Sequence, residues 1–178
     1  MLVYYKDPDY TNIVIDEEGF FHTGDIGTIV DGIFLKITDR KKEIFKLSAG
    51  KYVAPQVIET MLKESSYIEN CMVVGENQKF ASALIIPAFS RLHYWAAKHK
   101  IQFEDNDDLI KNPEVQKKIN SEIELVNQKL AVHEQIKRIK LINDEWTPLN
   151  DMLSPTLKLK RNKINTKYNS LINEIYKI

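Results

Sequence analysis

The alternation of apolar and polar positions predicts short strands in several parts of the chain. Residues 68–74 and 80–86 are runs rich in β-forming residues, and the polar segment GENQK between them is typical of an antiparallel pair. Residues 136–142, IKRIKLI, alternate apolar with basic side chains and predict a third strand. Between residues 29 and 37, the Asp-Gly turn inside IVDGIFLKI predicts a β-hairpin.

Apolar residues at helical spacing predict helices between and after these strands. A helix begins at Pro55 and runs to about Ser65, and a second follows Ser90, which we expect to be its N-cap. Pro113 begins a long amphipathic helix, and a final helix covers residues 163–176. The apolar faces of these last two helices consist of Val115, Ile119, Ile123, Val126 and Leu130, and of Ile164, Tyr168, Leu171, Ile172 and Ile175.

Turn-forming and polar residues mark the segments between these elements. We expect turns around short apolar pieces in residues 1–21, a polar loop at DNDD (residues 105–108) and a loop from Trp146 to Pro155. The pattern predicts an α+β fold, in which a small mixed or antiparallel sheet of about three main strands, plus an N-terminal hairpin, is flanked by helices. We expect residues 1–40 and 41–178 to belong to different domains.

Composition and charge narrow the class of protein. Of the 178 residues, 43% are hydrophobic and 28% are charged, which is ordinary for a globular protein in water. Lys plus Arg and Asp plus Glu are equal at 25 each, so the net charge gives no electrostatic basis for general nucleic-acid binding. No apolar stretch is long enough to span a bilayer, while peripheral contact with a membrane stays open.

The cysteine and histidine content excludes several kinds of site. Cys71 has no partner for a disulfide, and its place in the apolar run CMVV predicts a buried structural thiol. The four histidines show no metal-ligand spacing such as HExxH, so we expect no metal site built from this chain's residues. A reducing, cytoplasmic setting fits this cysteine usage best.

The segment HTGDIG, residues 22–27, is the first of three candidate sites. An ionised carboxylate only accepts hydrogen bonds, and the two hydroxyls of a ribose are donors, so Asp25 on a glycine turn is suited to bind a ribose. The alternative is an Asx-type turn, in which Asp25 bonds its own backbone. The hexamer alone favours the turn.

The second candidate is the basic segment DRKKEIFKLSAGKYVAP. Arg40 offers a rigid fork of donors for the oxygens of a ribose or phosphate. Lys42 and Lys46 lie four residues apart, beside the loop from Ser48 to Gly50. The alternative is a solvated run of charges, and the segment alone favours it.

The third candidate is SPTLKLKR, just before the last predicted helix. An extended stretch from Leu157 to Lys160 would place both lysines on one face and both leucines on the other, where a lysine can reach an oxyanion. The alternative is an amphipathic edge strand with its polar face in water. The chain contains no GxxxxGK[ST] or GxGxxG motif and no nucleophile beside a base.

In this order, GFFHTGDIG, DRKKEIFKLSAGKYVAPQVIE and SPTLKLKR resemble the motifs of the AMP-forming acyl-CoA synthetases, and look closest to those of the long-chain fatty acid–CoA ligases. The resemblance covers essentially the whole chain. It implies the mobile C-terminal domain of such an enzyme, with the end of its large N-terminal domain. Enzymes of this family activate a fatty acid with ATP to an acyl-adenylate, release pyrophosphate, and then transfer the acyl group to CoA.

The resemblance also implies the ligands and the partner. The expected cofactors of the complete enzyme are ATP, Mg²⁺ and CoA, and its substrate is a fatty acid. The Ser/Thr/Gly-rich phosphate loop and the acyl tunnel belong to the large domain, which this chain lacks, so we expect a C-terminal fragment that is inactive alone. One alternative is a stand-alone binding or regulatory module without catalysis, and another is a related ligase for a different carboxylic acid.

Candidate residues carry over from the family by their positions in these motifs. Asp25 and Arg40 resemble the residues that bind the ribose of ATP. Lys42 falls at the hinge about which the C-terminal domain turns. Lys46 and the loop from Ser48 to Gly50 fall on the side that meets CoA.

A lysine near the C-terminus carries the adenylation role in the resemblance. Lys160 resembles the lysine that bridges the carboxylate and the α-phosphate, where a cation opposes the developing charge. Leu159 replaces the glycine that precedes this lysine in the general motif, so the register is open and Lys158 is the alternative.

Overall fold

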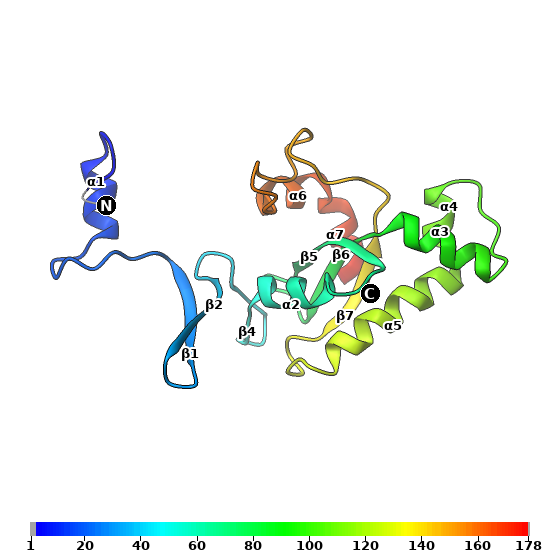
Figure 1. The fold of residues 1–178 in the computed structure, drawn as a ribbon, viewed down its shortest axis with the longest axis horizontal. Coiled ribbons are helices and arrows are strands. Elements are labelled where there is room, and N and C mark those ends of the chain that lie inside the picture. Colours follow the sequence, from blue (N-terminus) through cyan, green and yellow to red (C-terminus); the bar gives the residue numbers. More distant parts are fainter. Residues whose placement is uncertain (1–2, 178) are drawn as a thin grey trace. The chain divides into compact units, whose positions relative to one another are not determined.

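The computed structural model describes residues 3–177, apart from the side chains of residues 38 and 39. The chain forms two compact units, Met1–Ile44 and Phe45–Ile178, whose elements are labelled in Figure 1. The domain boundary that the sequence places at residues 40–41 stays a prediction.

The first unit contains a short helix and the predicted hairpin. Strands β1 (Asp25–Val30) and β2 (Phe34–Arg40) pair antiparallel, so the hairpin is confirmed and is longer than predicted. The turns expected around Pro8, Asp9 and Asn12 were wrong, because α1 (Pro8–Val14) forms there, whereas the N–H of Gly19 donates to the Asp16 carbonyl at 3.0 Å in a turn. Asp7 caps α1 by accepting the backbone N–H of Tyr10 at 3.0 Å. A proline directly after an N-cap aspartate is a helix-start signal.

The second unit is built on a three-stranded sheet in the order β5-β6-β7. β5 (Ile68–Val74) and β6 (Ala81–Pro87) are antiparallel, as predicted, and β7 (Ile136–Leu141) runs parallel to β6. A separate two-stranded sheet pairs β3 (Phe45–Lys46) with β4 (Tyr52–Val53). The mixed sheet with flanking helices confirms the α+β class.

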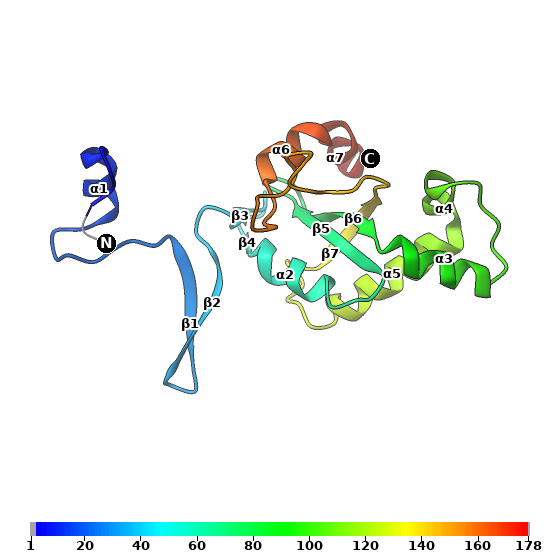
Figure 2. The same ribbon diagram turned by 45° about the horizontal axis from the view of Figure 1, so that its top comes forward.

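Helices cover both faces of this sheet, as Figures 1 and 2 show. α2 (Pro55–Leu62) and α5 (Pro113–Asn127) pack on one face, and α6 (Arg161–Lys167) with α7 (Asn169–Tyr176) on the other. The central strand β6 is therefore buried on both sides, and alternate residues of β5 enter different cores. Cys71 and Val73 belong to the core under α2 and α5, while Met72 and Val74 belong to the core under α6 and α7.

The crossover from β6 to β7 differs from the prediction in two places. α3 (Phe89–Lys98) begins before Ser90, because the carbonyl of Ala88 accepts from the N–H groups of Arg91 and Leu92, both at 3.0 Å. Ser90 is therefore inside the helix and is not its N-cap. The predicted loop at residues 105–108 is largely α4 (Asn106–Lys111), which Asp105 caps through the N–H of Asp108. Buried Leu109 and Ile110 hold this helix against the core.

The predicted final helix is divided at Tyr168, which has φ −105° and ψ 20°. Its ring is buried in the core under α6 and α7, and its hydroxyl donates to the carboxylate of Asp144. This tertiary contact interrupts the helix, although the helical spacing of apolar residues continues unbroken through Tyr168 in the sequence. The extended stretch expected from Leu157 to Lys160 was also wrong, because Leu157 has φ +59° and is 67% exposed, while Leu159 packs on the core.

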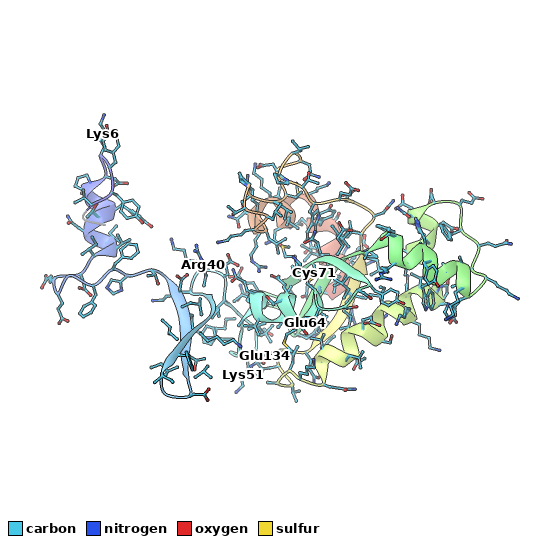
Figure 3. All side chains as sticks on the ribbon, in the orientation of Figure 1. Lys6, Arg40, Lys51, Glu64, Cys71 and Glu134 are labelled. Atoms are coloured by element: carbon cyan, nitrogen blue, oxygen red, sulfur yellow. The ribbon has the colours of Figure 1, made fainter. Side chains whose placement is uncertain are left out.

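Cys71 is buried, as predicted, and lies within the second unit (Figure 3). Burial, and then the charge of Glu59, raise the pKa of its thiol far above the ordinary value, which leaves it unreactive. Among the described residues, no helix combines the length and the apolar character needed to cross a membrane.

Candidate functional site

Asp25 and Arg40 face each other across the β1–β2 hairpin. They are partners in the strand register, and the Arg40 Nε lies 3.3 Å from Asp25 Oδ1. The Asp25 side chain is 27% exposed and that of Arg40 is 56% exposed, so both reach solvent. The sequence nominated these two residues from separate segments, and the register of the hairpin brings them together. Figure 3 labels Arg40 at the end of β2.

The turn before β1 presents Asp25 without using its carboxylate. Gly24 has φ +72°, a conformation that favours glycine, and its carbonyl accepts from the N–H of Lys41 at 2.8 Å. The backbone N–H of Asp25 donates to the Thr23 hydroxyl at 3.0 Å. The side-chain acceptor that stabilises this turn is therefore the hydroxyl of Thr23. The carboxylate of Asp25 is directed to Arg40, where its remaining lone pairs can accept the two hydroxyls of a ribose.

Lys42 lies in the turn that follows β2. This turn closes on Arg40, whose carbonyl accepts from the N–H of Glu43 at 2.9 Å and from that of Ile44 at 3.3 Å. The first compact unit ends at Ile44, two residues after the exposed Lys42. A tight, exposed turn at the junction of two units is suited to a hinge.

The loop from Ser48 to Gly50 connects β3 to β4 and is exposed. Gly50 has φ +83° and donates to the Leu47 carbonyl at 2.8 Å. The N–H of Ser48 donates to Gln78 at 2.9 Å, and Leu47 is buried in the core, so the loop has a fixed base. The ammonium of Lys46 lies 5.8 Å from the centre of the Tyr52 ring. This arrangement places the Lys46 cation at the end of β3, beside an exposed loop with an anchored base.

Residues 151–160 form a small hairpin, named here the lysine hairpin. Leu153 and Leu159 make a β-bridge, and both pack on the core under α6 and α7. The N–H of Lys158 donates to the Ser154 hydroxyl at 3.0 Å, while the side chain of Lys158 is exposed. Lys160 is half-buried, and its ammonium pairs with Asp151. The two candidate lysines therefore have different surroundings.

Glu59 and Arg161 form an ion pair that sequence reasoning missed. The guanidinium of Arg161 donates from Nη1 to Glu59 Oε1 at 2.9 Å and from Nη2 to Oε2 at 2.6 Å. Glu59 is only 6% exposed and belongs to the buried face of α2. A signal was present in the sequence, because Glu59 falls next to Ile58 and three residues before Leu62 on the apolar stripe of the helix.

The described residues contain no group of three His, Cys, Asp or Glu placed to hold a metal ion. A cavity of about 500 Å³ lies along β7, with Lys111, Arg138 and Leu171 among its lining residues. None of the residues that the sequence nominated lines it.

Comparison with known proteins identifies what the chain is similar to. Residues 42–178 match the profile of the AMP-binding enzyme C-terminal domain. The chain is 36% identical to long chain acyl-CoA synthetase 6, peroxisomal, of Arabidopsis thaliana, over 98% of this chain and 25% of the relative. It is also 36% identical to long-chain-fatty-acid–CoA ligase 6 of Homo sapiens, with the same coverage. The chain thus spans about a quarter of the curated relatives it matches.

Solved structures share the fold. The adenylation domain of a carboxylate reductase from Mycobacterium chelonae superposes with a TM-score of 0.80 at 26% identity, over 98% of this chain and 26% of that chain. The corresponding domain from Segniliparus rugosus, in complex with AMP and a co-purified carboxylic acid, has a TM-score of 0.79 at 24% identity, with the same coverage.

Proposed function

Because the chain belongs to the family of AMP-binding enzyme C-terminal domains, we propose that it is the C-terminal part of an AMP-forming long-chain fatty acid–CoA ligase. The relatives that support this proposal carry that activity in their names and match 98% of the chain. The observation on which the proposal chiefly rests is the Asp25–Arg40 pair, because it unites two residues of separate family motifs in one solvent-accessible polar site.

The proposed reaction has two halves. A fatty acid carboxylate attacks the α-phosphorus of ATP, which gives an acyl-adenylate and releases pyrophosphate. The thiol of CoA then attacks the acyl carbon, which gives acyl-CoA and releases AMP. ATP supplies the activating adenylyl group and CoA the accepting thiol. In this proposal Mg²⁺ accompanies ATP as a counterion of its phosphates.

Each candidate residue has a role that its surroundings permit. The Asp25 carboxylate accepts the ribose hydroxyls, and Arg40 holds that carboxylate in place and adds donors to the ribose oxygens. Lys42 is the hinge. Lys46, the last residue of β3, offers a cation to the phosphates of CoA, and the exposed loop from Ser48 to Gly50 approaches its pantetheine arm.

The adenylation lysine is Lys160 or Lys158, and the contacts in the structure favour Lys158. Lys160 is half-buried and already paired with Asp151, whereas the side chain of Lys158 is exposed and has no ion pair with any described residue. An exposed lysine on an anchored hairpin can enter an active site without first breaking an ion pair. Its positive charge then opposes the negative charge that builds on the attacked phosphate.

Parallel substitution of the two lysines in the full-length ligase tests this proposal. Alanine in place of the adenylation lysine, Lys158 or Lys160, lowers the rate of acyl-adenylate formation by about 10²-fold to 10³-fold. The rate of acyl transfer from a supplied acyl-adenylate stays within a few-fold of the parent rate. The other Lys→Ala substitution changes both rates by a few-fold at most. Equal loss of both half-reactions from each variant would contradict the assignment.

The isolated chain provides a control for the whole proposal. It spans about a quarter of the relatives it matches and in this proposal lacks the Ser/Thr/Gly-rich phosphate loop of the large domain, so we expect no acyl-CoA from ATP, palmitate and CoA. Turnover by the purified chain would show that this chain holds a complete active site.

A second candidate, activation of a different carboxylic acid, is favoured by the likeness to the adenylation domain of a carboxylate reductase. A panel of aryl and alkyl acids, assayed by pyrophosphate release from the full-length enzyme, separates the two. Preference for long alkyl acids supports the fatty acid ligase, and preference for aryl acids supports the second candidate. The cytoplasmic location, with peripheral membrane contact left open, stays a prediction.

A further inference from the structure

The buried carboxylate of Glu59 is the meeting point of three segments of the second unit. It belongs to α2, accepts the backbone N–H of Val73 in β5 at 2.7 Å, and receives both guanidinium bonds from Arg161. Its side chain is 7% exposed and that of Arg161 is 16% exposed. A charge pair removed from water in this way is costly unless the geometry is good and the remaining lone pairs are bonded, and both conditions hold here.

Arg161 lies next to the lysine hairpin, so the pair connects this hairpin to the rest of the second unit. Arg161 is the first residue of α6 and directly follows Lys160, the last residue of the lysine hairpin. The pair joins residues 102 positions apart in the sequence. The end of the lysine hairpin is therefore fastened to α2 by a two-point contact, which restrains orientation as well as distance, and Glu59 in turn is bonded to β5.

The hairpin has a second support of a different kind. Leu153 and Leu159 bridge each other and pack on the core under α6 and α7, and the N–H of Lys160 donates to Met152 at 2.9 Å. The apolar contacts hold the hairpin against the sheet, but they allow sliding and rotation more readily than a charged fork does. The ion pair supplies the directional restraint.

Glu59 also connects this hairpin to the loop on the proposed CoA side. α2 begins at Pro55, directly after β4, and β4 pairs with β3, which carries Lys46. Val53 of β4 and Leu47 lie in the same core as Ile58 of α2. The element that follows the β3–β4 loop and the element that follows the lysine hairpin are thus locked together through Glu59 and Arg161.

We propose that Glu59 and Arg161 are positioning residues, which hold the lysine hairpin in a fixed orientation on the second unit so that its lysine reaches the adenylation site. This inference rests on the proposed function. Neither side chain contacts the reacting atoms in this scheme. The ion pair keeps the hairpin in one orientation on the second unit. When this unit rotates, the lysine therefore reaches the same position each time.

Hydrogen exchange of the isolated chain tests whether the ion pair holds the lysine hairpin in place. This measurement does not require enzymatic activity. The double variant Glu59→Gln/Arg161→Met removes both charges and keeps an acceptor for Val73, so it avoids leaving one charge buried alone. We expect amide exchange in residues 151–160 to rise about tenfold or more, with β5 and β6 unchanged. A folded double variant whose hairpin exchanges at the parent rate would overturn the proposal.

A matched ion pair elsewhere in the second unit serves as the control. Glu122 is partly buried, pairs with Lys118 at 2.6 Å and accepts from the Ser65 hydroxyl at 2.8 Å. Glu122→Gln therefore weakens a comparable pair far along the chain from the hairpin. It leaves exchange in residues 151–160 unchanged if the effect is specific, and equal loosening by this control counts against the proposal.

If the double variant does not fold, Arg161→Lys is measured in the same way. Lysine keeps the positive charge opposite Glu59 but loses the two-point geometry, so we again expect faster exchange confined to the hairpin. Exchange at the parent rate in this variant would overturn the proposal.

Kinetics of the full-length enzyme separate this inference from the proposed function. We expect the double variant, or Arg161→Lys if the double variant does not fold, to lower kcat of adenylation about tenfold. The KM for ATP should change by less than about twofold, and the rate of acyl transfer should stay the same. A change confined to KM, or equal loss in both half-reactions, would overturn the positioning role. If neither lysine-to-alanine variant affects adenylation, the proposed function fails instead, whatever the exchange data show.

Discussion

The ammonium of Lys160 forms an ion pair with the carboxylate of Asp151, which also lies 3.3 Å from the ammonium of Lys163. Asp151 has φ +62°, so the chain turns sharply at the start of the lysine hairpin and directs this carboxylate back toward its end. The bond to Lys160, followed by that to Lys163, holds the pKa of Asp151 below its ordinary value. Both partners of Asp151 remain substantially exposed, so each pair is weak and reversible.

Replacing Asp151 with asparagine should make Lys160 more reactive. The variant removes a weak, solvent-screened ion pair, so we expect the rate of acetylation of Lys160 by acetic anhydride to rise about twofold to fivefold. Lys158, on the same hairpin but without this pair, is the internal control and should change little. Peptide mass spectrometry after a short pulse measures both sites, and an unchanged rate at Lys160 would argue against the pair in solution.

The acid dependence of stability should include a contribution from Asp144. Its carboxylate pairs with Lys167 at 2.8 Å and accepts the hydroxyl of Tyr168, and these bonds, that to Lys167 first, lower its pKa from the ordinary 3.8. Because the pKa of Asp144 is lower in the folded state, its ionised carboxylate stabilises the fold above pH 3.8. This contribution is lost as the pH falls through the folded-state pKa. The parent chain should therefore lose stability over this acid range.

Comparison with Asp144→Asn isolates this contribution. The asparagine variant should melt at a lower temperature than the parent at neutral pH, and the difference should shrink as the pH falls below 3.8. Thermal unfolding followed by circular dichroism across this range measures it. A difference that stays constant with pH would show that the effect of the substitution is not electrostatic.

Asn127→Ala should destabilise the second unit markedly. Asn127 is 4% exposed, and its side chain donates to the carbonyl of Ile136 at 3.0 Å and accepts from its N–H at 2.9 Å. Alanine leaves both backbone groups of Ile136 buried without these partners, which costs about 2–4 kcal/mol of unfolding free energy.

Asn120→Ala is the control in the same helix. Its side chain is exposed and, among the described residues, bonds only to the carbonyl of Gln116 one turn earlier, so the loss should be about 0.5 kcal/mol or less. Urea unfolding of the two variants gives both values. Similar losses would mean that the paired bonds to Ile136 contribute little.

Gly75→Ala should cost more than Gly50→Ala, although both glycines have positive φ. A Cβ on Gly75, at φ +152°, would lie 3.0 Å from the carbonyl oxygen of Phe80 and 3.2 Å from the Cα of Ala81, and backbone atoms yield little. We expect about 3 kcal/mol for this overpacking. At Gly50, with φ +83°, the nearest atom is 3.7 Å away at the flexible end of Lys46, so only the conformational cost of about 1 kcal/mol applies. Urea unfolding ranks the two, and the reverse order would contradict the crowding at Gly75.

Local patterns predicted most of the elements that carry their own signal. β5 was predicted with the bounds it has, and Pro55 and Pro113 begin their helices as expected, because hydrophobic spacing and proline at the first turn are local properties. α1 and α4 were missed where an aspartate N-cap stood in a polar segment. Those signals were local too, but the polar composition was interpreted as a loop.

The residues of the candidate site also differ in whether a local sequence pattern could predict them. Asp25, Arg40 and the two hairpin lysines were nominated from short motifs, since each motif is contiguous in sequence. Glu59 gave only a faint signal, a charge on an apolar stripe, because its partner lies in another part of the chain.

By itself, the sequence determined which residue types are available and where strands, helices and turns form, because these depend on neighbours a few positions away. Only the tertiary structure decided that Tyr168 divides the last helix, that Arg161 fastens the lysine hairpin to Glu59, and that Lys158 and Lys160 differ in exposure. These features come from burial and from bonds between distant segments. No local periodicity encodes them, since the free energy that selects them exists only once the sheet has brought those segments together.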